Sequence, residues 1–182
     1  MTDPELIAGV VKRDRRAFDL FYDRYAQIIF NLCVRILKDE AEAQDVLQEI
    51  FLQIWRDAER FDASRASVKT WLFTIARSRS LDRYRSRKVA GTRIEDKPDD
   101  QLQQIPDRVD LQNASVTQQY VINALARLSA EQRLVLELSY YEGLTQEEIA
   151  ERLREPLGTI KSRIRTGLIK LRTLFSDEES DA

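Results

Sequence analysis

Apolar side chains recur every three or four positions along the first 88 residues, which is the spacing of a helix with one buried face. Pro4, directly after Asp3, is typical of a first helical turn. Residues 3–88 are therefore predicted to form several packed helices. The pattern is clearest in the segment 14–37, where the apolar stripe comprises Phe18, Phe21, Tyr22, Tyr25, Ile28, Ile29 and Leu32.

Short polar motifs mark where several helices begin. Asp39 and Glu42 form a capping pair for a helix that is predicted to run to about Trp55, and Ser67 is placed to cap the next helix. The helical period returns at about residue 116. Two further capping boxes are predicted there, at Ser129 with Gln132 and at Thr145 with Glu148.

The helical period disappears between residues 89 and 112, where Gly, two Pro and several acidic residues indicate a linker. We find no strand pattern and no internal repeat. The predicted fold class is all-α, with two small helical domains joined by an acidic linker. The predicted division is a domain at 1–88, a linker at 89–115, a second domain at 116–176 and an acidic tail at 177–182.

The composition fits a mostly helical, globular protein, since 43% of the 182 residues are hydrophobic and the chain has five Gly and four Pro. No apolar run reaches the roughly 18 residues that a membrane helix needs. The N-terminus lacks the pattern of a signal peptide. One cysteine leaves no internal disulfide. A cytoplasmic location without membrane insertion is therefore predicted.

The chain has no histidine, the commonest general base and a frequent metal ligand. It also lacks a Gly-rich phosphate loop and a G-x-S-x-G motif. Carboxylate or Ser/Lys chemistry stays formally open. We expect no enzymatic activity, no metal and no cofactor.

Charge is distributed in blocks, although the net charge is only −2. Residues 65–93 contain nine Lys or Arg and one acid, and residues 152–172 contain seven and one. The segment between them, 94–113, contains six acids and two bases. Two basic regions separated by an acidic segment suggest a polyanionic partner.

The segment 144–172 has the layout of a helix-turn-helix motif. Thr145 caps a short helix, Pro156 follows a break, and a second helix is predicted to restart at Gly158-Thr159 with Ile160, Ile164 and Leu168 inward. An ordinary helical hairpin with a solvated basic face is the alternative. Polar residues suited to base edges favour DNA, and the outward face carries Lys161, Ser162, Arg163, Arg165 and Thr166.

A second basic segment, 71–88, begins with aromatic residues. Trp71 and Phe73 precede a run that contains six Lys or Arg and one acid. Basic residues suit phosphates, and rings with small polar side chains suit unstacked bases. Trp71 fits a core position at least as well as a contact with a base.

Three segments, 42–55, 68–85 and 128–164, together resemble regions 2 and 4 of a bacterial sigma-70-family factor, and the short form resembles the extracytoplasmic-function (ECF) subfamily. The resemblance implies a specificity subunit that binds core RNA polymerase and directs transcription initiation at −10 and −35 promoter elements. The implied partners are the clamp helices and flap of core RNA polymerase, promoter DNA and, as for many ECF factors, a cognate anti-sigma factor.

The resemblance also implies a role for individual residues. Binding to core polymerase falls to Asp45, Gln48, Glu49, Leu52 and Trp55. Contact with the −10 element falls to Phe61, Ser64, Lys69, Arg77, Ser78 and Arg85. Contact with the −35 element falls to Thr159, Lys161, Ser162, Arg163, Arg165 and Thr166.

The chain departs from the family pattern at several of these positions. Many relatives have Asn at Ser78, Gly at Arg154, an apolar residue at Glu155 and a basic residue at Thr166, so neither promoter sequence is carried over. Two other function classes stay open: a stand-alone helix-turn-helix repressor, and a site-specific recombinase, which would need an α/β domain. Cys33, on an apolar helix face, is expected to be buried rather than to sense redox state.

Overall fold

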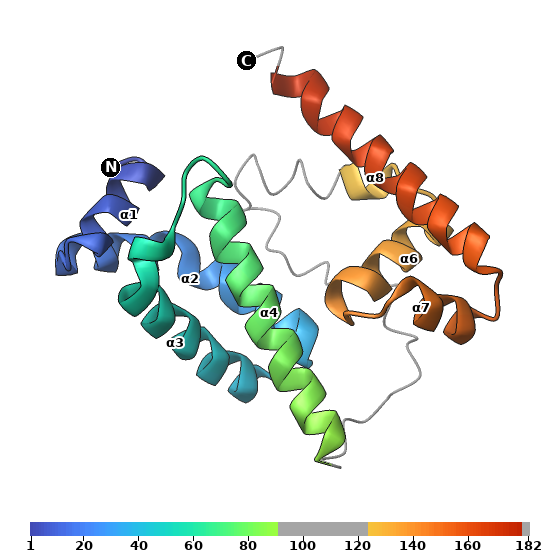
Figure 1. Cartoon of the computed structure of the whole chain (residues 1–182), viewed down its shortest axis with the longest axis horizontal. Helices are drawn as coiled ribbons and strands as arrows, with labels where there is room; N and C mark the ends of the chain where they lie inside the picture. The colour runs from blue at the N-terminus through green and yellow to red at the C-terminus, as the bar shows by residue number, and fades with distance from the viewer. Residues whose placement is uncertain (91–123, 180–182) are drawn as a thin grey trace. The chain divides into compact units, whose positions relative to one another are not determined.

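The computed structural model describes residues 1–90 and 124–179, with side chains as far as Leu174. These residues form two compact units, and each is described by itself. Both units consist of helices, and the described parts contain no strand (Figure 1). The predicted all-α class with two helical domains is confirmed. The predicted linker lies outside the described residues from position 91 onward.

The N-terminal unit is built around one long central helix, α2. This helix packs against α1, α3 and α4, and α3 also packs against α4 (Figure 1). Two compact connections fit between these helices because Arg13 and Lys38 adopt left-handed backbone conformations, with φ of 61° and 54°. The elements are α1 (Asp3–Val11), α2 (Arg15–Leu37), α3 (Glu40–Asp57), the 3-10 helix η1 (Ala58–Arg60) and α4 (Val68–Val89).

The helix starts in this unit follow the polar motifs of the sequence. An Asp39 carboxylate oxygen accepts a hydrogen bond from the Glu42 amide at 3.1 Å, and the Ser67 hydroxyl accepts one from the Thr70 amide at 3.1 Å. These bonds satisfy backbone donors that the first helical turn leaves without partners. Both predicted caps are confirmed, and α3 ends at Asp57, two residues beyond the predicted end.

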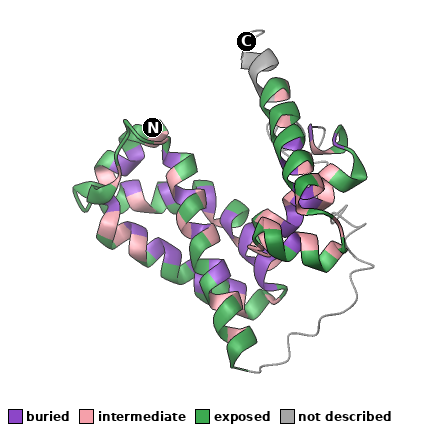
Figure 2. Cartoon of the chain, turned by 45° about the vertical axis from the view of Figure 1, so that its right-hand side comes forward, coloured by how far each residue is buried: buried purple, intermediate pink, exposed green. Residues whose placement is uncertain are grey.

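The apolar stripe of α2 is buried in part, which corrects the prediction at two positions. The buried series runs Phe21, Tyr25, Ile29, Leu32 and Ile36, whereas Ile28 falls outside it and is 48% exposed. Tyr22 also lies at the edge and is 38% exposed, but its ring packs on Phe51 at 4.7 Å between centroids. Figure 2 shows the buried faces of the helices turned inward.

Cys33 belongs to the core of this unit, as predicted. Its side chain is fully buried, and burial raises the pKa of the thiol. The buried Ser80 hydroxyl lies 3.4 Å from the sulfur and donates to the Ala76 carbonyl at 2.8 Å. A buried thiol with a raised pKa is poorly placed for redox chemistry, because the thiolate is the reactive form.

The C-terminal unit contains α6 (Ala130–Tyr141), α7 (Gln146–Leu153) and α8 (Leu157–Glu179). Ser129 with Gln132 and Thr145 with Glu148 form the two predicted capping boxes. Both α6 and α7 pack against α8. The small core between the three helices consists of Val135, Leu138, Ile149, Ile160 and Ile164.

The turn between α7 and α8 is closed by backbone bonds. Arg154 adopts a left-handed conformation with φ of 53°, and the Glu155 amide donates to the Ala150 carbonyl at 3.0 Å. This 6→1 bond is the kind that ends helices at a left-handed residue. The position that relatives usually fill with Gly therefore keeps its conformation with Arg. The second helix starts at Leu157, slightly before the predicted restart.

The inward face of α8 differs from the prediction at Leu168, which is 53% exposed. The buried position belongs to Gly167 instead. A Cβ at Gly167 would lie 3.0 Å from the Leu136 side chain, so the missing side chain lets α6 pass close to α8. One residue further, at about 100° around the helix, Leu168 points away from that contact.

No helix in residues 1–90 or 124–179 is both long enough and apolar enough to span a membrane.

Candidate polymerase and nucleic-acid interfaces

One face of α3 carries side chains that stay exposed in the packed unit. Asp45, Gln48, Glu49 and Leu52 are all exposed, and their spacing of three and four positions places them on the same side of the helix. Leu52 is 59% exposed between polar neighbours. A mixed polar and apolar face of this kind suits a protein partner better than water alone.

Trp55, the fifth residue predicted for polymerase binding, is half-buried. Its ring packs against Phe18 at 5.0 Å between centroids. The Arg13 guanidinium stacks over the same ring, 5.6 Å from its centroid. Trp55 therefore joins the edge of the α3 face to the core, and only part of its ring is available to a partner.

Arg13 also closes the end of α3, which the sequence did not indicate. One of its nitrogens donates to the Trp55 carbonyl, and the other donates to the Arg56 carbonyl at 3.2 Å. These carbonyls belong to the last turn of the helix, where carbonyl groups have no hydrogen-bond donor within the helix. Arg13 precedes Trp55 by 42 positions, so no local motif could have indicated the contact.

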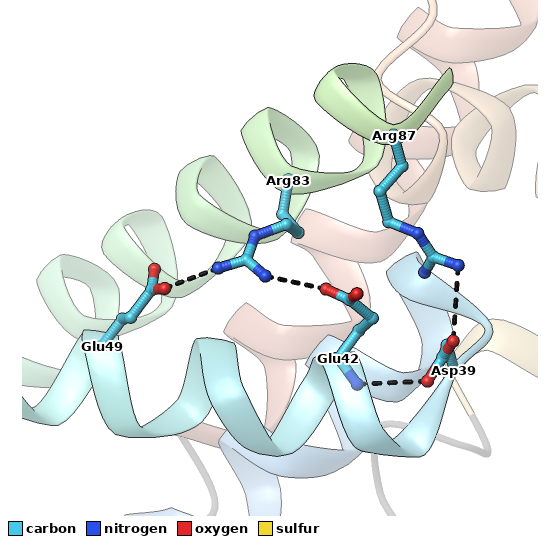
Figure 3. A network of polar contacts seen from close by, with 5 residues as sticks. All are labelled: Asp39, Glu42, Glu49, Arg83 and Arg87. Carbon is cyan, nitrogen blue, oxygen red and sulfur yellow. Dashed lines mark hydrogen bonds and ion pairs between the residues drawn. The ribbon is translucent and has the colours of Figure 1, made fainter. Parts of the chain in front are cut away.

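Three arginines of the basic run on α4 are fixed to α3. Arg83 bridges two carboxylates, with 2.8 Å to Glu42 and 2.5 Å to Glu49 (Figure 3). Arg87 pairs with Asp39 at 3.4 Å. Arg79 donates to the Gln53 side chain at 2.8 Å. The basic run is therefore in part a set of ties between helices.

The hydrogen bond that Arg83 donates to Glu42, together with the negative charges of Glu49, Glu42 and Asp45, raises the pKa of Arg83 against the effect of burial. The guanidinium is charged at any physiological pH, and its fork of donors suits two carboxylates at once. Arg83 and Arg87 are four residues apart and project on the same side of α4. The two arginines and Asp39, Glu42 and Glu49 are called the α3–α4 ladder below.

The loop before α4 holds the first residues predicted for −10 contact. Phe61 is half-buried, with its ring 5.5 Å from that of Trp71, which is itself half-buried. The Asp62 carboxylate accepts from the Ser64 amide at 2.9 Å and from its hydroxyl at 2.7 Å. These two bonds lower the pKa of Asp62 and give the exposed loop a fixed local shape.

The remaining −10 candidates lie on α4. Lys69, Ser78 and Arg85 are exposed, and Arg77 is half-buried. Ser78 and Arg85 are seven residues apart, which is close to two turns, so they share a side of the helix. Lys69 lies in the first turn, near the loop. The structure thus brings the loop and the start of α4 together, while Arg85 lies four turns further along.

The predicted −35 residues fall into three groups on α8. Lys161, Ser162 and Arg165 are exposed. Arg163 pairs with Glu155 of the turn at 2.7 Å. The Thr166 hydroxyl accepts from the Gln132 side chain at 3.1 Å and donates to the Ser162 carbonyl at 2.8 Å. Thr159, at the helix start, is half-buried.

Among the described residues, no group of three or more His, Cys, Asp or Glu is placed to hold a metal ion. The arrangement consists of an acidic and apolar helix face, a loop with aromatic residues, and a basic helix after a tight turn. The first of these surfaces has the chemistry for a protein partner, and the other two have the chemistry for nucleic acid.

Family comparisons identify the class of protein that carries these surfaces. The model of sigma-70 region 2 matches residues 21–89, and that of sigma-70 region 4 matches residues 124–173. The first match contains the α3 face and α4, and the second contains the helix-turn-helix. The two regions occur in the order that the sequence predicts.

Relatives that match most of the chain identify the subfamily. An ECF RNA polymerase sigma factor SigK of Mycolicibacterium vanbaalenii is 37% identical over 174 residues, which covers 92% of this chain and 86% of that protein. One from Mycobacterium tuberculosis is 36% identical over 168 residues, covering 92% and 90%. The chain belongs to the ECF group of the sigma-70 family.

Solved structures include similar chains. The chain of Rhodobacter sphaeroides SigE in complex with the anti-sigma ChrR is 30% identical, with a TM-score of 0.48, over 94% of this chain and 97% of that one. CnrH in complex with the cytosolic domain of CnrY is 23% identical, with a TM-score of 0.46, over 96% and 97%.

Family membership establishes the function at the level of the class. This chain is a sigma factor that directs promoter-specific transcription initiation with RNA polymerase. Sigma factors are transcription specificity factors and act with the polymerase in the cytoplasm. The repressor and recombinase alternatives are set aside.

Proposed function

We propose that this ECF sigma factor binds core RNA polymerase through the exposed face of α3. The observation that carries this proposal is the set Asp45, Gln48, Glu49 and Leu52, which is exposed on a helix whose other side is buried in the core. Two carboxylates and an amide offer acceptors to a basic partner, and Leu52 offers an apolar contact beside them. Trp55 adds the accessible part of its ring at the edge.

The −10 element is assigned to the loop before α4 and to α4 itself. Phe61 and Ser64 lie in the loop where an unstacked base would be captured, and aromatic rings and small hydroxyls suit such a base. Lys69, Arg77 and Arg85 supply positive charge for the strand backbone, and Ser78 faces the same side as Arg85. Capture of melted bases favours the open promoter over the duplex.

The −35 element is assigned to α8. Lys161, Ser162 and Arg165 are exposed near the start of a helix that follows a tight turn, as in proteins whose second helix enters the major groove. Thr159 sits at the helix start. Arg163 and Thr166 complete the proposed surface, although each also contacts a residue of its own unit.

The proposal includes the organisation of the whole chain. It assigns residues 1–88 to polymerase binding and −10 recognition, 89–115 to a flexible acidic linker, 116–176 to −35 recognition and 177–182 to an acidic tail. The chain itself carries no catalytic site in this proposal and acts in the cytoplasm. Contact with the polymerase flap and with a cognate anti-sigma factor are further predictions from the family resemblance.

The test compares two triple variants of the full chain. Asp45→Ala, Gln48→Ala and Glu49→Ala together remove two acids and one amide from the α3 face. Asp19, Asp23 and Gln27 are exposed on α2 and likewise offer two carboxylates and one amide for a control variant. Both variants lose the same net charge. A difference between their polymerase affinities therefore depends on where the side chains lie and not on net charge.

Binding to core polymerase and run-off transcription from promoter fragments are then measured for both variants. We expect the α3 variant to lose polymerase binding and transcription while its helicity and melting stay close to those of the parent, since exposed substitutions usually change stability by under about 0.5 kcal/mol. The α2 variant should behave as the parent. Equal polymerase affinity in all three proteins would refute the proposed docking face.

A further inference from the structure

One carboxylate of the proposed docking face is tied to the helix that bears the −10 residues. Glu49 accepts a hydrogen bond from Arg83 of α4 through its Oε1 at 2.5 Å. The side chain of Glu49 is still 48% exposed. In Figure 3 its second oxygen points away from Arg83. The carboxylate therefore has one fixed oxygen and one oxygen directed elsewhere.

Arg83 is itself held from the other side. Its Nη1 donates to Glu42 at 2.8 Å, and the backbone amide of Glu42 is capped by Asp39. Asp39 in turn pairs with Arg87 at 3.4 Å. The guanidinium thus has a fixed anchor in the first turn of α3, and it reaches along the helix to Glu49, two turns further.

We propose that Arg83 is a positioning residue for polymerase binding, which holds the Glu49 carboxylate in the orientation that core polymerase requires. The inference rests on the proposed function of Glu49 as a docking residue. A carboxylate has acceptor capacity on both oxygens, so Glu49 can keep Arg83 on one and accept a donor of the partner on the other. Ordering a flexible side chain before binding lowers the cost of ordering it at the interface.

The same ion pair also admits the opposite role, in which Arg83 competes with the polymerase for Glu49. The second oxygen argues against competition, because a partner can bind there without displacing Arg83. The two roles differ in sign: removal of Arg83 weakens polymerase binding if it positions Glu49 and strengthens it if it competes.

The chain provides a matched control for this test. Arg87 lies one turn after Arg83 on α4 and pairs with Asp39, which is not part of the docking face. Arg83→Gln and Arg87→Gln remove the same charge from the same helix, and each breaks part of the α3–α4 ladder. A general effect of charge or of loosened packing between α3 and α4 should therefore appear in both variants.

Affinity for core polymerase is measured without DNA, using fluorescently labelled full-length sigma factor, alongside circular dichroism and thermal melting. We expect Arg83→Gln to bind about three- to fivefold more weakly, the scale of a partly exposed ion pair, and Arg87→Gln to bind as the parent does. Arg83→Lys keeps the charge but not the two-pronged fork, so it should restore part of the loss.

A double-substitution cycle separates this inference from the docking proposal. Glu49→Gln should weaken polymerase binding, and adding Arg83→Gln to it should cause no further loss. If Glu49→Gln leaves affinity unchanged, Glu49 does not dock, and both ideas fail at that residue. If Glu49→Gln weakens binding but Arg83→Gln leaves it unchanged, tightens it or acts additively with Glu49→Gln, docking stands and positioning by Arg83 is overturned.

Discussion

The two basic helices, α4 and α8, have similar charge in the sequence but use it differently in the structure. On α4, Arg79, Arg83 and Arg87 all contact side chains of α3. On α8, Lys161 and Arg165 are exposed, and Arg163 contacts its own turn. The number of arginines in a segment therefore does not show how much positive charge is available to nucleic acid. The contacts of each arginine within the protein have to be known first.

The difference has a geometric origin. The helix α4 lies along α3, whose first turn is acidic. Arg83 and Arg87, four positions apart on α4, therefore meet carboxylates, and Arg79, one turn earlier, meets the Gln53 amide.

The basic start of α8 follows a tight turn and packs on α6 and α7 through Ile160 and Ile164, with one polar contact between Thr166 and Gln132. The Lys161 and Arg165 side chains therefore stay exposed on α8.

The largest contrast between the units is expected from adding one methyl group at a glycine. A Cβ at Gly9 would lie 2.4 Å from the Ala17 Cβ, where α1 meets α2, whereas a Cβ at Gly158 at the start of α8 would meet nothing within 4 Å. We expect Gly9→Ala to destabilise the N-terminal unit by about 3 kcal/mol. Gly158→Ala should leave stability unchanged or raise it by up to about 1 kcal/mol. Thermal unfolding of the two variants measures both effects.

Equal melting temperatures of the two glycine variants would mean that α1 can shift away from α2 without a loss of stability. That result would also weaken the role given to Arg13, because Arg13 closes the same turn between α1 and α2 and reaches the end of α3 from there.

The next contrast concerns DNA. Lys161→Ala should cost about 1–3 kcal/mol of −35 affinity and relax preference at one base pair, because Lys161 is exposed near the helix start, where side chains meet base edges. If Arg165 contacts phosphate, Arg165→Ala should weaken all sequences alike and lower the salt slope by about one unit. Arg79→Gln on α4 is the control, since Arg79 contacts Gln53 and should leave the −35 salt slope unchanged. Holoenzyme affinity for single-base −35 variants at several salt concentrations measures all three.

Much of the fold was predictable because its signals are local. The caps at Asp39, Ser67, Ser129 and Thr145 each depend on residues three positions apart. Contacts between distant residues were not predictable in this way. The bond from Arg83 to Glu42 joins residues 41 positions apart, and nothing in the sequence near either residue indicates it.

The errors on the apolar faces have a similar cause. A helical period gives the direction of a buried stripe, but the neighbouring helix decides how wide it is. At Gly167 the absence of a side chain brings α6 close, and Leu168, which a period of four selects, is left exposed. For the candidate interfaces, the sequence predicts which residues are polar on an apolar helix, and the structure adds which of them are already paired.

The smallest expected effect tests whether Arg163 belongs with the paired arginines of α4 or with the exposed residues of α8. Arg163 is about a quarter exposed, and its Nη1 donates to Oε1 of Glu155 at 2.8 Å and lies 2.7 Å from Oε2 in the same ion pair. If this pair mainly braces the turn, Arg163→Gln and Glu155→Gln should each cost under about 1 kcal/mol of stability. Neither variant should then change −35 affinity by more than the general effect of removing one charge from the domain.

If Arg163 instead reaches DNA, the two variants should act in opposite directions. Arg163→Gln would weaken −35 binding, whereas Glu155→Gln would strengthen it, because it releases Arg163 and removes a negative charge beside the reading helix. Arg152 of α7, paired with Glu142 directly after α6, supplies a control of equal charge in Arg152→Gln. A loss of −35 affinity in Arg163→Gln that exceeds the loss in Arg152→Gln would place Arg163 in the DNA interface, and equal losses would leave it as a brace of the turn.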